Sequence, residues 1–147
     1  MRQAIPIHRI AALLLTIALA GCVRGATIHI HSGSSIRALV FELSEARRTT
    51  DPIRNLDQFA VYDGECSHSG PETPVWIVES VAPDGISPGP RLLSYGTPPP
   101  GTRATVGPMV LAPNHCYRAV VRGAGVRGSM WFSVSTNGTV QETASGA

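Results

Sequence analysis

The stretch LAPNHCYRAVV, residues 111–121, decides the fold class of this chain. Its second half alternates, because Tyr117, Ala119 and Val121 fall on one side of an extended backbone while Arg118 falls on the other. A period of two predicts a β-strand with one face in a core and the other toward solvent. The proline and asparagine ahead of the alternation indicate a turn before the strand.

The same kind of pattern recurs along the chain. After residue 22, short segments rich in valine, isoleucine, threonine and aromatic residues are separated by glycine, proline, asparagine and aspartate. Asn137-Gly138 is the strongest short signal for a hairpin. The apolar spacing of residues 35–46 also permits a helix. We expect an all-β domain of roughly seven to nine strands. The expected strands lie within residues 26–32, 35–46, 57–66, 74–82, 91–96, 102–113, 116–123, 129–135 and 139–142.

Leu111, Pro113 and Tyr117, followed by the alternating apolar residues, stand where fibronectin type III domains carry the same residue types. The stretch resembles a tyrosine corner, in which the ring packs inward and the hydroxyl bonds a backbone group upstream. The resemblance implies a single antiparallel β-sandwich of the immunoglobulin-like kind. Cys116 precedes the tyrosine, whereas immunoglobulin domains carry their second cysteine two residues after it, so the usual bridge between sheets is not implied. This architecture hosts many unrelated roles, so the resemblance indicates no activity.

The first 22 residues, MRQAIPIHRIAALLLTIALAGC, have the layout of a secretory signal: a basic start, a short apolar middle and small residues at the end. As a helix, the apolar run at residues 10–20 would reach about half of a ~30 Å hydrocarbon core, so it is too short for a permanent span. We expect residues 1–21 to form a signal helix that is cleaved from the mature chain.

The end of this signal, Leu19-Ala20-Gly21-Cys22, resembles the lipobox of bacterial lipoproteins. In that family the cysteine thiol receives a diacylglycerol, the signal is cut just before it, and the new N-terminus is acylated. The resemblance implies that Cys22 becomes the lipidated first residue. Two or more acyl chains hold a protein stably at a membrane.

The domain boundaries follow from this cleavage. Residues 22–26 would be the lipidated N-terminus and a short tether, and residues 27–147 the β-sandwich domain. Val23 and Arg24 follow the cysteine in place of an aspartate. This pair resembles the residues that follow the cysteine in Gram-negative lipoproteins sorted to the outer membrane. The resemblance implies a protein anchored there that faces the periplasm or the cell surface.

Charge argues against a nucleic-acid partner. The chain has twelve arginines, no lysine and ten acidic residues. Arg2 and Arg9 leave with the signal, so residues 22–147 carry no net charge. A nucleic-acid or polyanion binder is expected to be clearly basic.

Two cysteines remain once Cys22 is lipidated. Export to an oxidising compartment favours a disulfide between Cys66 and Cys116. A bridge closing a loop of about fifty residues would stabilise the fold by at most about 4 kcal/mol. Both cysteines lie at expected strand ends, which would suit a staple across the sandwich.

The alternative is a metal site for zinc or copper(I). Two thiolates and one or two imidazoles would suit either ion. The chain has no CxxC or HxxxH motif, the close ligand spacings that would support a metal site. The candidate ligands are His29, His31, Cys66, His68, His115 and Cys116.

A second candidate site is a binding patch of Arg118, Arg122, Arg127 and Trp131. The first two arginines share a strand face, and the third lies in the turn beyond. The arginines could contact an acidic partner or lipid headgroups. An exposed Trp131 beside them would resemble a contact site for a protein or glycan.

No motif in the chain predicts catalysis. GAGVRG (residues 123–128) and GISPG (residues 85–89) match the letters of nucleotide-binding and nucleophile motifs, but neither is followed by an expected helix. We therefore expect a membrane-anchored lipoprotein without enzymatic activity or cofactor. It would serve the cell envelope as a binding or structural accessory module, with an envelope protein or glycan as partner. The alternatives are a periplasmic metal-binding lipoprotein and a secreted, non-lipidated β-sandwich protein.

Overall fold

The computed structural model describes residues 24–46 and 51–143. This part of the chain forms nine β-strands and no helix, so the expected all-β class is confirmed. No helix that could cross a membrane is found among these residues. The expected signal helix in residues 1–21 and the lipidated Cys22 lie outside the described residues. The strands are β1 (Arg24–Ile30), β2 (Val40–Glu45), β3 (Leu56–Gly64), β4 (Thr73–Ser80), β5 (Leu92–Ser94), β6 (Thr102–Val106), β7 (His115–Gly123), β8 (Val126–Val134) and β9 (Val140–Thr143).

The local sequence signals predicted these strands well. Each expected segment overlaps one strand, although several strands begin up to three residues earlier, and residues 35–46, which also permitted a helix, form a turn followed by β2. The Asn137-Gly138 pair makes the turn between β8 and β9, where Gly138 adopts a φ of 80°. A positive φ at this position is the reason a glycine suits the turn.

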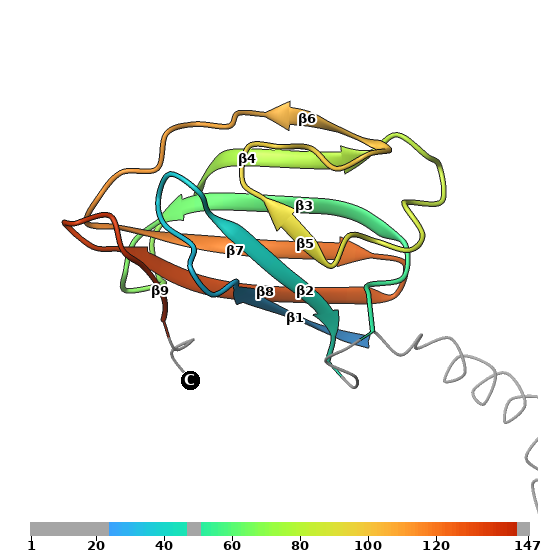
Figure 1. Ribbon diagram of the computed structural model, residues 1–147, viewed down its shortest axis with the longest axis horizontal. Coiled ribbons are helices and arrows are strands. Elements are labelled where there is room, and N and C mark those ends of the chain that lie inside the picture. Colours follow the sequence, from blue (N-terminus) through green and yellow to red (C-terminus); the bar gives the residue numbers. More distant parts are fainter. Residues whose placement is uncertain (1–23, 47–50, 144–147) are drawn as a thin grey trace, which may run out of the picture.

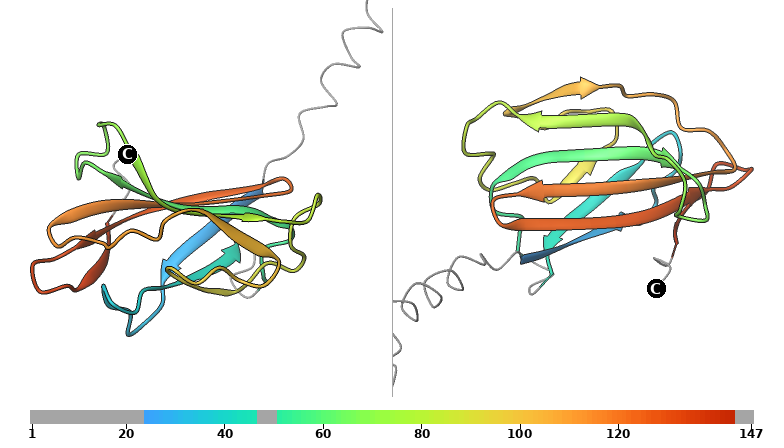
Figure 2. Two further views of the ribbon diagram at one scale, coloured as in Figure 1. Left: turned by 90° about the horizontal axis from the view of Figure 1, so that it is seen from above. Right: turned by 180° about the vertical axis from the view of Figure 1, so that it is seen from behind.

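The strands form one continuous sheet in the order β5-β2-β1-β8-β7-β3-β4-β6, with β9 also paired to β8. All neighbours are antiparallel except β1 and β8, which run parallel through Arg24↔Val126 and Gly25↔Arg127. The expectation of a wholly antiparallel arrangement is therefore wrong. The sheet is mixed and strongly curled: β2, β1 and β5 fold over one face of the remaining strands (Figure 1), and the view from above separates these two layers (Figure 2).

Strand β1 belongs to both layers. Its first two residues pair with β8, whereas Ala26 to Ile30 pair with β2. The crossing is close, because a Cβ at Gly128 of β8 would lie 2.2 Å from the carbonyl oxygen of Ala26. A glycine in the strand interior lets the two backbones approach where β1 leaves one partner for the other.

The early start of β1 corrects one expected boundary. Residues 24–26 were expected in the short tether, but they already pair with β8 and β2. In the sequence, Val23 alone separates Cys22 from Arg24, the first strand residue that the structure describes.

Aromatic side chains fill the space between the layers. Phe41 of β2 contacts Phe59 of β3, with ring centroids 5.0 Å apart, and Phe132 of β8 at 5.7 Å. All three side chains are fully buried. Burying each side chain contributes roughly 2–3 kcal/mol, so these contacts hold the folded-over part of the sheet on the rest.

The tyrosine corner expected from the sequence is present. Tyr117 is 1% exposed, and its hydroxyl oxygen accepts a hydrogen bond of 2.8 Å from the backbone N–H of Ala112. The bond fixes the loop that leads into β7 against the strand itself.

We expect Tyr117→Phe to lower the free energy of unfolding by about 1–2 kcal/mol, because it leaves the Ala112 N–H without its acceptor. Urea denaturation measures the change. Tyr62→Phe is a matched control, since no hydrogen bond of the Tyr62 hydroxyl is found within the described residues; its effect should stay within about 0.5 kcal/mol. Equal stability of Tyr117→Phe and the wild type would show that the corner bond does not hold this loop.

Candidate functional site

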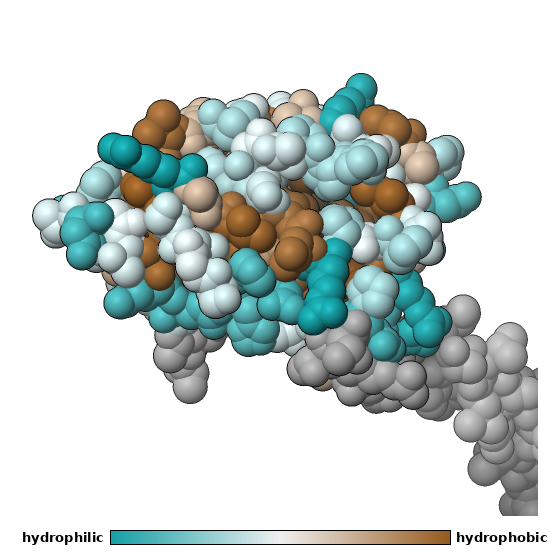
Figure 3. Space-filling model, in the orientation of Figure 1, coloured by the Kyte–Doolittle hydropathy of each residue, from teal (hydrophilic) through white to brown (hydrophobic). Residues whose placement is uncertain are grey.

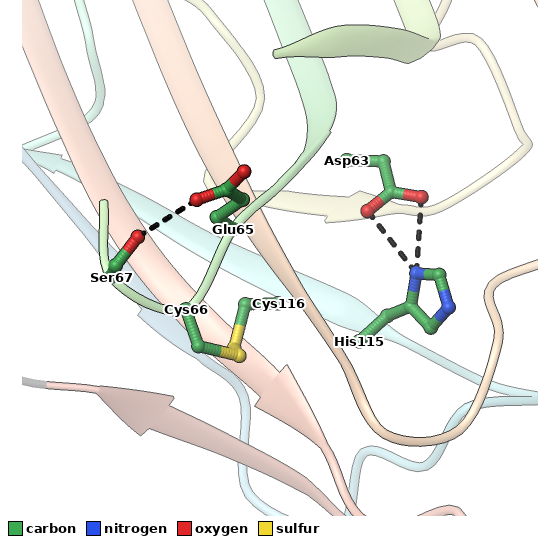
Figure 4. Close-up of a disulfide and its surroundings, with 6 residues drawn as sticks. All are labelled: Asp63, Glu65, Cys66, Ser67, His115 and Cys116. Atoms are coloured by element: carbon green, nitrogen blue, oxygen red, sulfur yellow. Dashed lines mark hydrogen bonds and ion pairs between the residues drawn. A yellow bond between two sulfur atoms is a disulfide. The ribbon is translucent and has the colours of Figure 1, made fainter. Parts of the chain in front are cut away.

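Cys66 and Cys116 are joined in a disulfide, with their Cα atoms 5.1 Å apart (Figure 4). Cys66 lies just after β3, and Cys116 lies on β7 opposite Gly64 of β3. The bridge therefore ties neighbouring strands of one sheet. The expectation of a staple across two layers is wrong, because β3 and β7 are adjacent in the strand order.

The structure does not gather the six candidate metal ligands. The two sulfur atoms are bonded to each other, so neither is a free thiolate. Among residues 24–46 and 51–143, no three histidine, cysteine or acidic side chains are placed to hold one metal ion. The histidines instead have separate neighbours: His29 lies by Glu142, His31 by Glu42, His68 by Trp131 and His115 by Asp63.

Trp131, expected in an exposed patch, is only 8% exposed. It lies on the outer face of β8, where the ring of His68 stacks on it with centroids 4.2 Å apart. Gly64 also lies against it, since a Cβ there would be 3.0 Å from the indole ring. The segment between β3 and β4 therefore covers the tryptophan.

Arg118 is also engaged within the fold. Its Nε donates a hydrogen bond of 3.0 Å to Glu72, and its guanidinium lies 5.7 Å from the ring centroid of Tyr62. Arg122 and Arg127 are exposed and directly opposite each other on β7 and β8. Only these two members of the expected patch are free for a partner, so the four residues do not form one open surface.

A different feature, which sequence reasoning missed, is an apolar pocket of about 490 Å³. It lies between the β1–β2 loop, the end of β5 and the loop that connects β6 to β7. The apolar run GPMVLAP, residues 107–113, is the sequence signal for this pocket. The run falls within the strand expected in residues 102–113, whereas β6 ends at Val106 and the run forms the loop that follows. The lining residues are Ile36, Arg37, Tyr95, Gly96, Pro108, Met109, Val110 and Leu111.

The β6–β7 loop holds its apolar side chains outward. Met109 is 51% exposed and Val110 is 96% exposed. The backbone of Met109 is fixed on both sides: its N–H donates to the carbonyl of Val75 at 3.0 Å, and its carbonyl accepts from the Tyr95 hydroxyl at 2.7 Å. Burial raises the pKa of Tyr95 from its ordinary value near 10 to about 12, so its hydroxyl remains a donor over a wider alkaline range.

Gly107 allows this loop to pass close to β4. Its φ is 63°, and a Cβ there would lie 2.1 Å from the carbonyl oxygen of Val75. At the other end of the loop, Leu111 is 3% exposed and the tyrosine corner fixes Ala112. The exposure of Val110 is therefore imposed by a fixed backbone between two attachment points.

The pocket lies at the end of the domain away from the start of β1. Arg24 sits beside the β7–β8 turn, where its N–H donates to the carbonyl of Gly125. The loops that line the pocket lie at the opposite ends of β1 and β7 (Figure 1). Apolar side chains reach the surface in the middle of this face and near both of its ends (Figure 3). The length of β1, about 20 Å, separates the two ends.

The segments that match the letters of nucleotide-binding and nucleophile motifs lie in or beside the loops between strands. Gly125, with a φ of 68°, makes the turn between β7 and β8, and Ser87 lies in the connection between β4 and β5. Neither precedes a helix in the part of the chain that the structure describes. The helix N-terminus that a phosphate site or a nucleophile elbow needs is missing at both places.

No known protein family, no curated protein and no solved structure matches this chain.

We expect the intact protein to weigh two hydrogens less than its fully reduced form, because Cys66 and Cys116 are joined. The double variant Cys66→Ser/Cys116→Ser should lose up to about 4 kcal/mol of unfolding free energy, since the bridge closes a loop that contains β4, β5 and β6. Mass spectrometry and urea denaturation measure these effects, and reduced wild type is the control that should match the variant. Two free thiols in the exported protein would contradict the bridge.

Proposed function

We propose that this chain is a bacterial lipoprotein, anchored through Cys22, whose β-domain is a non-catalytic binding module of the cell envelope. The observation that carries the binding role is the apolar pocket with its outward-held Met109 and Val110. The two exposed side chains adjoin the apolar wall of the pocket, and contiguous apolar surface on a folded domain is typical of a site that meets a ligand or partner.

The start of β1 supports an anchored arrangement. With only Val23 between Cys22 and Arg24, a lipidated Cys22 would hold that end of the domain close to the bilayer. The pocket would then face away from the membrane at a distance of about 20 Å or more. This orientation presents the pocket to other envelope components, a protein or a glycan being the partner classes that the sequence indicates.

We also propose that the curled sheet is a variant of the immunoglobulin-like β-sandwich. The contact of Phe41 with Phe59 and Phe132 between the layers and the tyrosine corner at Tyr117 support this assignment. The parallel pairing of β1 with β8 is the main departure from an antiparallel sandwich.

Lipidation is tested on the full chain expressed in a Gram-negative host. We expect the mature protein to begin at Cys22, to carry the mass of a diacylglycerol and an amide-linked acyl chain on its first tryptic peptide, and to fractionate with the outer membrane. Cys22→Ser should keep its signal and gain no lipid. Val23→Ala is the matched control and should be processed as wild type. A soluble protein with an unmodified cysteine would favour the secreted, non-lipidated alternative.

The binding role is tested with a photoreactive amino acid in place of Val110. We expect illumination of intact cells to join this position to an envelope component, because the side chain projects from the pocket rim. Val81 is the matched control, since it is also exposed (61%) but lies beyond the other end of β4. Equal crosslinking at both positions, or none at either, would contradict a partner at the pocket.

A further inference from the structure

We propose that the apolar pocket binds a single-chain anionic amphiphile, with the alkyl chain along the apolar wall and the acidic headgroup beside Arg37. The inference uses the same pocket as the proposed function, but it does not depend on lipidation of Cys22.

The wall of the pocket has the chemistry of an alkyl-chain site. Ile36, Pro108, Met109, Val110 and Leu111 supply apolar side chains, and the aromatic ring of Tyr95 adds to them. The volume of about 490 Å³ lies within the usual range for small-molecule sites, which is roughly 300–1,000 Å³.

The pocket has one charge, and it is positive. Arg37 is exposed, and no ion pair or hydrogen bond of its guanidinium is found within residues 24–46 and 51–143. No acidic residue is among the side chains that line the pocket. The site is therefore complementary to a ligand with an anionic group at one end of an apolar body.

The apolar surface of the pocket is of a size for a small ligand, and a protein partner would need to contact further surface around it. A standard protein interface covers about 800 Å² on each partner. Among the described residues, the exposed large hydrophobic side chains at this end are only Met109 and Val110. The fixed backbone of Met109 also means that a ligand need not order the loop before it binds.

The length of the ligand's alkyl chain and the charge of its headgroup should change the dissociation constant by very different amounts. Each buried methylene contributes about 0.8 kcal/mol, so two added carbons should lower Kd about tenfold. An exposed ion pair with Arg37 is weak and should change Kd by no more than about fivefold. The alkyl chain therefore sets the affinity, and Arg37 sets the preference for an anion.

The test is titration calorimetry on the soluble chain 23–147, which contains every residue of the described core. The probes are alkyl carboxylates of eight, ten and twelve carbons, each kept below its critical micelle concentration, and the alkyl amines of equal length. We expect one site per chain, a Kd that falls about tenfold for each two carbons, and tighter binding of the carboxylate than of the amine.

Two pairs of variants separate the contribution of the headgroup contact from that of the apolar wall. Arg37→Gln should abolish the preference for the carboxylate and keep the dependence on chain length, whereas Arg103→Gln, another exposed arginine without an ion pair in the described structure, should change neither. Val110→Asn should weaken binding of every probe, and Val81→Asn should not.

No saturable binding of any probe would overturn the inference, as would binding that is unchanged in Val110→Asn. Equal affinity for carboxylate and amine in the wild type would overturn the anionic preference. A protein adduct at position 110 in cells, together with no alkyl binding, would assign the pocket to a protein partner. That result would end this inference and leave the proposed binding role intact.

Discussion

The divided pairing of β1 is the constraint on which the rest of the structure depends. Two residues of this strand pair with β8 and the next five pair with β2, so a single strand carries the sheet from one layer to the other. The change of partner requires the close approach of Ala26 to Gly128, where no side chain fits. Once β1 has crossed, Phe41 of β2 can reach Phe59 and Phe132, and the apolar faces of the sheet cover each other.

The same crossing also places the two ends of the domain. The start of β1 is paired beside the β7–β8 turn, so Arg24 is held at one end. The β1–β2 and β6–β7 loops meet at the other end, where Tyr95 and Val75 bind the backbone of Met109. An anchor at Cys22 and a pocket beside Val110 would therefore lie at opposite ends of the domain.

Much of the fold could be predicted because its signals are local. The alternation around Tyr117, the Asn137-Gly138 turn and the buried hydroxyl of the tyrosine corner involve residues close in sequence. The predicted patch around Trp131 failed for the opposite reason. Alternation showed that this side chain could face away from the core, but its burial depends on His68, which lies in a segment far along the chain.

The sequence by itself determined the all-β class and the approximate positions of the strands, since strand period and turn chemistry act over a few neighbouring residues. The tyrosine corner was expected from the resemblance of residues 111–121 to fibronectin type III domains. Only the tertiary structure decided the parallel contact of β1 with β8, the placement of the disulfide within one sheet and the pocket beside Arg37. Each of these depends on segments that are distant in the sequence and become neighbours when the sheet curls, and no local pattern specifies which distant segments will meet.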